Sequence, residues 1–129
     1  VERQIAEDQV TKSEELSSPS IEKVELSKKI VRDDTIDSVA RVKIENNNIK
    51  GSISLQGAII DDIIFKNYKE SLESDQKVIF LNPKSSDEGY YIGTGWASNS
   101  NEELKLPLDN TIWKVKGNKV LTPNKPIVL

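Results

Sequence analysis

The feature that most constrains this fold is an alternation of apolar and polar residues with a period of two, which begins near residue 41. Val42 and Ile44 alternate with charged neighbours, and Ile53 and Leu55 continue the same pattern after an intervening run of asparagines. Successive side chains of a β-strand point to opposite faces, so this pattern gives each strand one apolar face. The two runs and the turn-forming asparagines between them predict a β-hairpin.

Further short strands are expected downstream, because several apolar runs are separated by Gly, Pro and Asn. They lie at 59–68, 78–81, 90–96, 111–115, 120–121 and 127–129. Many short strands without a long amphipathic helix predict an all-β fold, either a sandwich of antiparallel sheets or an open sheet. The sequence ends inside the last apolar run, and an unpaired strand edge is usually avoided, so we expect the sandwich to be incomplete.

The predicted core follows from the same alternation. In the 90–96 strand, the bulky side chains share one face, and Gly93 and Gly95 occupy the other. The residues expected in the core are Ile53, Leu55, Phe65, Tyr90, Ile92, Trp96 and Trp113.

Composition divides the chain near residue 40. Residues 1–40 hold 6 basic and 10 acidic residues and contain no aromatic residue and no Gly. Such a segment buries too little apolar surface to offset its loss of conformational entropy. We therefore expect residues 1–40 to be a charged, mostly disordered linker or arm, and residues 41–129 to be the β domain.

Missing residue types restrict the chemistry. The sequence contains no His and no Cys, the residues that most often act as a general base, nucleophile or zinc ligand. The one carboxylate pair in a strand-like context is Asp61 and Asp62, and adjacent strand residues point apart, so we expect one of them to be solvated or bonded within a turn. The sequence therefore predicts no enzyme activity, no cofactor and no metal site.

Charge and hydropathy exclude two further classes of partner. The 18 Lys and Arg are outnumbered by 21 Asp and Glu, whereas duplex-binding proteins usually carry a concentrated positive surface. No apolar run approaches the roughly 20 residues that span a bilayer. We expect no nucleic acid partner and no membrane span within this sequence.

The aromatic residues of the later strands have two interpretations. Together they could form a platform on which sugar rings stack, or they could fill the core and rim of a sandwich. Tyr91 and Tyr68 are the candidate binding residues, whereas the core interpretation is favoured for Trp96 and Trp113.

Five motifs follow one another in a fixed order along residues 51–126. The stretch 51–68 carries a Gly-Ser strand followed by hydrophobic-Asp-Asp-hydrophobic and Lys-x-Tyr patterns. The later motifs are a hydrophobic-x-Pro strand end at 80–83, Tyr-Tyr and Gly-Trp within 90–96, Thr-hydrophobic-Trp at 111–113, and Leu-Thr-Pro-x-x-Pro at 121–126. In this order they resemble the periplasmic domain of YidC-type membrane protein insertases, particularly α-proteobacterial members.

The resemblance implies a periplasmic β-sandwich shaped like sugar mutarotases, belonging to an inner-membrane protein. Its membrane tether would be a helix before the 1–40 linker, absent from this sequence. The implied role is to aid insertion and folding of inner-membrane proteins as a non-catalytic docking or bracing module. Implied partners are nascent inner-membrane proteins and accessory subunits of the Sec translocon. The alternative is a free-standing β-sandwich that binds carbohydrate or peptide.

Overall fold

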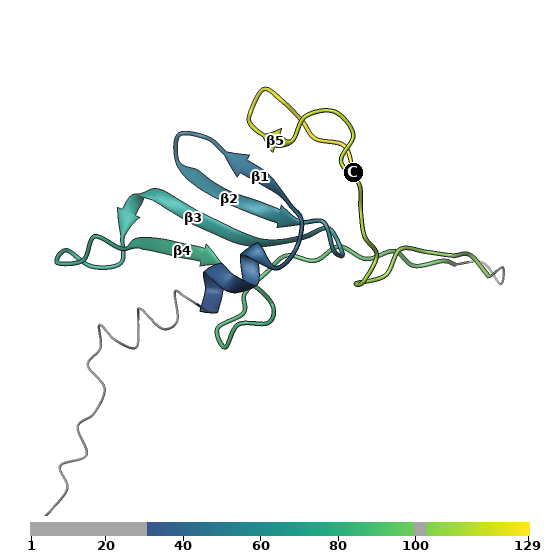
Figure 1. The fold of residues 1–129 in the computed structure, drawn as a ribbon, viewed down its shortest axis with the longest axis horizontal. Coiled ribbons are helices and arrows are strands. Elements are labelled where there is room, and N and C mark those ends of the chain that lie inside the picture. The colour runs from purple at the N-terminus through teal and green to yellow at the C-terminus, as the bar shows by residue number, and fades with distance from the viewer. Residues whose placement is uncertain (1–30, 100–102) are drawn as a thin grey trace, which may run out of the picture.

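The computed structural model describes residues 31–99 and 103–129, and its strands form a five-stranded sheet (Figure 1). The order across the sheet is β4-β3-β2-β1-β5. The strands are β1 (Arg41–Glu45), β2 (Ile49–Ser54), β3 (Ile59–Lys69), β4 (Lys77–Leu81) and β5 (Val120–Leu121). The fold is mostly β, as predicted, and the first four strands agree closely with the alternation in the sequence.

An antiparallel meander from β1 to β4 forms most of the sheet. Val42 pairs with Ile53 across the first hairpin, and Asn46 closes its turn. The Oδ1 atom of Asn46 accepts hydrogen bonds from the backbone N–H groups of Asn48 and Ile49, each at 2.8 Å. Asparagine is common in turns because its short side chain can satisfy such backbone donors.

The fifth strand departs from the antiparallel expectation. β5 lies beside β1 and runs parallel to it, with Lys43 opposite Val120 and Ile44 opposite Leu121. Parallel neighbours require a long connection, which the chain after residue 81 supplies. The prediction of an antiparallel arrangement is therefore wrong for this one pair.

A β-bulge interrupts the pairing of β2 with β3. Ser52 pairs with Asp62 but Ile53 pairs with Ile60, so Asp61 is an extra residue on β3. Beside the bulge, a side chain at Gly51 would overlap the backbone carbonyl of Asp62. The close approach of the two strands here therefore requires glycine.

The buried apolar core lies within the meander. The buried apolar residues are Val42, Ile53, Ile63 and Leu81. Ile53 is buried as predicted, whereas Leu55, Phe65 and Trp113 are half-buried.

The predicted core face of the 90–96 segment is wrong. Tyr90 is exposed, as are Ile92 at 50% and Trp96 at 63%. Single bridges, Asn82 with Tyr90 and Ile60 with Ile92, replace a continuous ladder. Without a ladder on either side, the alternation of this segment does not turn one face towards the core.

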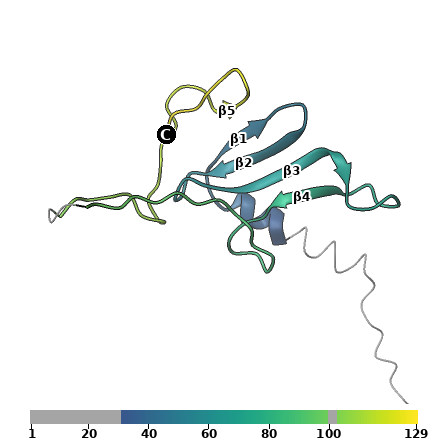
Figure 2. The same cartoon turned by 180° about the vertical axis from the view of Figure 1, so that it is seen from behind.

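Residues 31–37 are helical and lie against one face of the sheet, as the two opposite views show (Figures 1 and 2). The prediction that this part of the 1–40 segment is a disordered arm is wrong, because Arg32 is buried against the sheet. The rest of that prediction concerns residues 1–30, which lie outside the described residues. In the described part of the chain, no helix has the length and apolarity needed to cross a membrane.

Candidate functional site

A row of aromatic side chains crosses β3, β4 and the segment that follows. Phe65 is the centre of this aromatic row, which consists of Tyr68, Phe65, Phe80 and Tyr90. The ring centroids of Phe65 and Tyr68 are 5.8 Å apart, those of Phe65 and Phe80 are 5.2 Å apart, and those of Phe80 and Tyr90 are 6.4 Å apart. These are favourable separations for aromatic pairs. Because Tyr68, Phe80 and Tyr90 are exposed, the row offers a continuous apolar surface to solvent.

The two predicted binding residues lie in different places. Tyr68 is at one end of the aromatic row, whereas Tyr91 forms no ring contact with the row among the aromatic pairs of the described chain. The ring of Tyr91 instead lies beneath the ammonium of Lys84, whose Nζ is 5.6 Å from the ring centroid. At that distance a cation and an aromatic face attract each other.

Sequence reasoning did not identify Phe80 and Tyr90 as exposed neighbours of Tyr68. Phe80 belongs to the short apolar run 78–81, which predicts a buried strand, and the alternation of residues 90–96 predicts that Tyr90 lies in the core. Their contact depends on how β4 and the following segment align beside β3. The alternation within a single strand carries no information on that alignment.

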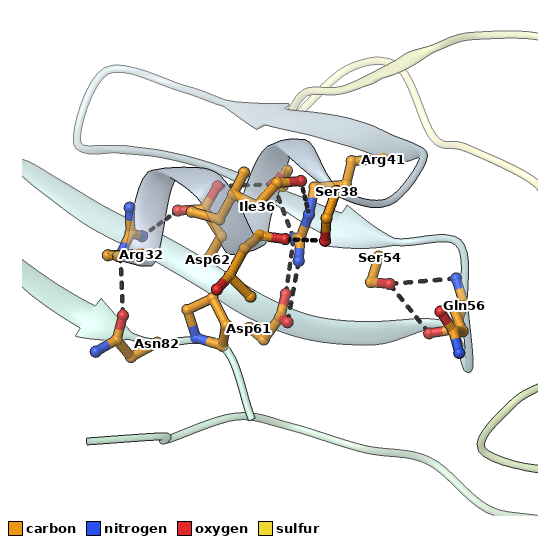
Figure 3. A network of polar contacts seen from close by, with 12 residues as sticks. Arg32, Ile36, Ser38, Arg41, Ser54, Gln56, Asp61, Asp62 and Asn82 are labelled. Atoms are coloured by element: carbon orange, nitrogen blue, oxygen red, sulfur yellow. Dashed lines mark hydrogen bonds and ion pairs between the residues drawn. The ribbon is translucent and has the colours of Figure 1, made fainter. Parts of the chain in front are cut away.

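A second feature lies between the helical segment and the sheet, where two arginines meet two aspartates (Figure 3). We call it the arginine–aspartate network; its residues are Arg32, Arg41, Ser52, Asp61, Asp62 and Asn82. The helical segment supplies Arg32, and strands of the meander supply most of the others.

Arg41 holds Asp61 in a two-pronged ion pair. Its Nη1 and Nη2 atoms donate to the two carboxylate oxygens of Asp61 at 2.7 Å and 3.1 Å. Nη1 also donates to the Ser52 Oγ at 3.1 Å, and Nε donates to the backbone carbonyl of Ile36 at 3.0 Å. A planar guanidinium suits this multiple contact, and a lysine could not reproduce it.

Arg32 forms the other ion pair. Its Nη2 donates to Oδ1 of Asp62, and its Nε donates to Oδ1 of Asn82 at 3.0 Å. The hydroxyl of Ser52 donates to the second oxygen of Asp62 at 2.7 Å. Ser52 therefore links the Arg32–Asp62 pair to the Arg41–Asp61 pair.

The expectation that Asp61 and Asp62 point apart, with one of them solvated, is wrong. The bulge makes Asp61 an extra residue, which re-aims its side chain into the same network as Asp62. The two aspartates are only 6% and 8% exposed, and each has an arginine partner. Each carboxylate is therefore held by a guanidinium, and removal of either partner would leave a buried charge unpaired.

Four further members of the network, Arg32, Arg41, Ser52 and Asn82, were not singled out by the sequence. The available signal was the presence of basic residues before a strand pair that contains adjacent aspartates. The pairing itself joins positions 20 to 50 residues apart, and it depends on the bulge. Within the described residues, no group of three or more acidic side chains is placed to hold a metal ion.

Comparison with known proteins gives a consistent result. A family model described as the YidC periplasmic domain matches residues 41–129. The membrane protein insertase YidC of Pelagibacter ubique (strain HTCC1062) is 36% identical over 129 residues, which cover 100% of this chain and 23% of the relative. No solved structure matches the chain significantly.

Two other relatives carry the same description. The membrane protein insertase YidC of Rickettsia bellii (strain OSU 85-389) is 41% identical over 90 residues, which cover 69% of this chain and 16% of the relative. That of Maricaulis maris (strain MCS10) is 32% identical over 132 residues, which cover 99% of this chain and 22% of the relative. The chain thus spans less than a quarter of the length of these relatives.

Proposed function

Because this chain belongs to the YidC periplasmic domain family, we propose that it serves a membrane protein insertase as a non-catalytic docking and bracing module. Family membership places residues 41–129 in the periplasm, as part of an inner-membrane protein. The module helps inner-membrane proteins to insert and fold, while the chemistry of insertion belongs to other parts of the protein.

The docking role is carried by the aromatic row. Exposed aromatic rings on a supporting sheet provide a large apolar contact area at a low cost in side-chain entropy. Phe65 is half-buried and holds Phe80 and Tyr68 in fixed geometry, so the surface is preorganised. A surface of this kind fits the apolar side chains of a nascent inner-membrane protein. Accessory subunits of the Sec translocon are a further proposed class of partner, inferred from the family resemblance.

The bracing role is carried by the arginine–aspartate network. It connects the helical segment, where the chain enters the domain, to two strands of the meander. Buried ion pairs fix geometry, because any displacement leaves a charge without its partner. The network therefore fixes the position of residues 31–37 against the sheet.

Site-specific photocrosslinking tests the docking role. A photoreactive residue is placed at Tyr68 or Phe80 in the complete insertase during synthesis of an inner-membrane protein. Lys43, an exposed residue of β1, is the matched control position. We expect crosslinks to the nascent chain from the aromatic row and none above background from position 43.

Equal crosslinking from all three positions would contradict a specific docking surface. Binding of a soluble oligosaccharide that Phe80→Ser abolishes would instead favour the carbohydrate-binding alternative. The tyrosine at position 91 gives an internal comparison, because it lies outside the row and is engaged by Lys84. Crosslinks from Tyr91 comparable to those from Tyr68 would restore it as a binding residue.

A further inference from the structure

We propose that the helical segment 31–37 is a two-point clasp that opens as a unit while the sheet stays folded, and that Ser52 couples its two attachment points. The inference concerns a movement of the domain and does not depend on the docking role of the aromatic row. The segment is held by polar contacts at two points, and apolar contact adds little to them.

The first attachment point is at the start of the described helix. Arg32 is 5% exposed, and it bonds to Asp62 of β3 and to Asn82 just beyond β4. A guanidinium buried to this extent is stable only while its partners remain in place.

The second attachment point is at the other end of the segment. The carbonyl of Ile36 accepts a hydrogen bond from Arg41 Nε at 3.0 Å, and Arg41 is held by Asp61. Both attachments therefore end at the adjacent aspartates of one bulge.

Apolar contact contributes little to holding the segment. Val31 is 56% exposed, Ile36 is half-buried, and Asp33 and Asp37 are exposed. A helix of a few turns is marginal in water on its own, so it loses its order once its charged contacts separate. The pairing within the meander includes no residue of this segment, so the sheet does not need the clasp closed.

Ser52 joins the two attachments through its hydroxyl. The oxygen accepts a hydrogen bond from Arg41 Nη1 at 3.1 Å, and the proton is donated to Asp62 Oδ2 at 2.7 Å. Each ion pair therefore orients this hydroxyl for the other. Without the hydroxyl, both ion pairs remain in place, but no hydrogen bond through residue 52 connects one pair to the other.

Hydrogen exchange measured peptide by peptide on the full chain tests the clasp. In Ser52→Ala, we expect amides of residues 35–38 to exchange roughly tenfold faster, and those of β2 and β3 to change less than about threefold. The matched control is Ser54→Ala. Ser54 is a buried serine of the same strand whose hydroxyl bonds to the backbone of Gln56. We expect Ser54→Ala to leave exchange in the helical segment unchanged.

Two results would overturn the proposal. One is an equal acceleration of helical and strand amides, which means that the segment opens only with the sheet. The other is unchanged exchange of residues 35–38 in Ser52→Ala, which means that Ser52 does not couple the attachments.

Exchange of the unsubstituted chain in low urea gives an independent measurement if Ser52→Ala does not fold. A clasp exchanges through an opening that depends weakly on urea, because little surface is exposed, whereas strand amides follow the steep dependence of global unfolding. Identical urea dependences for the two sets of amides would also overturn the proposal.

Discussion

The meander of residues 41–81 and the segment of residues 90–129 differ sharply in how they are held. In the meander, β1 pairs with β2 at five positions and β2 pairs with β3 at six. In the described part of the later segment, strand pairing with the sheet consists of the two-residue strand β5 and single bridges such as Gln56 with Ile112. Among the described residues, the buried Val, Ile and Leu side chains belong to the meander, whereas Ile92 and Trp96 are exposed. Burial in this molecule therefore follows continuous pairing.

The largest expected effect is in the meander, at its buried charges. Asp61→Ala leaves Arg41 of β1, whose side chain is 8% exposed, without its carboxylate, and breaking a buried pair in this way costs about 3–5 kcal/mol. The matched control is Asp75→Ala, which breaks an exposed ion pair with Lys69. Such a pair stabilises the fold by less than about 1 kcal/mol. Urea unfolding of both variants measures the difference. Equal losses would mean that the network does not stabilise the meander more than a surface pair does.

A somewhat smaller effect is expected at the apolar core of the meander. Leu81 is fully buried at the end of β4, and Leu81→Ala should cost about 3 kcal/mol through lost burial and the cavity left behind. Leu104→Ala in the later segment removes an exposed side chain and should change stability by about 0.5 kcal/mol or less. Thermal melts of the two variants compare the regions directly. A similar fall in melting temperature for both variants would show that a side chain contributes equally to stability in the two regions.

Trp96→Ala tests the later segment most directly. Emptying a buried tryptophan site costs about 3–5 kcal/mol, but a side chain as exposed as Trp96 should contribute about 1 kcal/mol or less. Tryptophan fluorescence in a background with Trp113→Phe reports on Trp96 alone. We expect the emission maximum of a tryptophan side chain that is exposed to water. A blue-shifted maximum with a large loss of stability would mean that Trp96 is packed, and the contrast between the regions would fail there.

The smallest effect concerns a surface ion pair at the turn end of the first hairpin, between Glu45 and Lys66. A hydrogen bond from Lys66, and then its positive charge, lower the pKa of Glu45 below the usual value for glutamate. A lowered folded-state pKa means that the pair stabilises the chain above the unfolded-state pKa and that this gain is lost as pH falls through the folded-state value. Glu45→Gln should therefore slightly flatten the acid limb of the stability curve, and more so at low salt. An unchanged acid limb would show that Lys66 does not act on this carboxylate.

The first four strands could be predicted from the sequence because their signal is local. Val42, Ile44 and Ile53 report the face on which each strand is buried, and Asn46 reports the turn. The sequence also offers Tyr68 as a candidate binding residue, and its side chain is exposed near the end of β3. In each of these cases, the evidence lies within a few residues of the feature.

The other features depend on contacts between distant positions. A bulge at Asp61 is invisible until the register of β2 against β3 is known, and the bulge decides where both aspartates point. The helical segment 31–37 lacks the apolar periodicity that predicts a docked helix, because buried charge at Arg32 takes the place of apolar contact. Trp96 has the pattern of a core strand and no ladder beside it.

The parallel pairing of β5 with β1 has a consequence for the order of events during folding. Lys43 meets Val120, so this contact closes a loop of 77 residues (120 − 43), whereas β1 and β2 meet across a short turn. Closing a longer loop costs more entropy, and distant pairings form more slowly than local ones. Synthesis runs from the N-terminus, so the residues of the meander are made before residues 120–121. During that interval β1 presents the edge that β5 later covers, and the exposed charges of Lys43 and Glu45 discourage a second chain from pairing there.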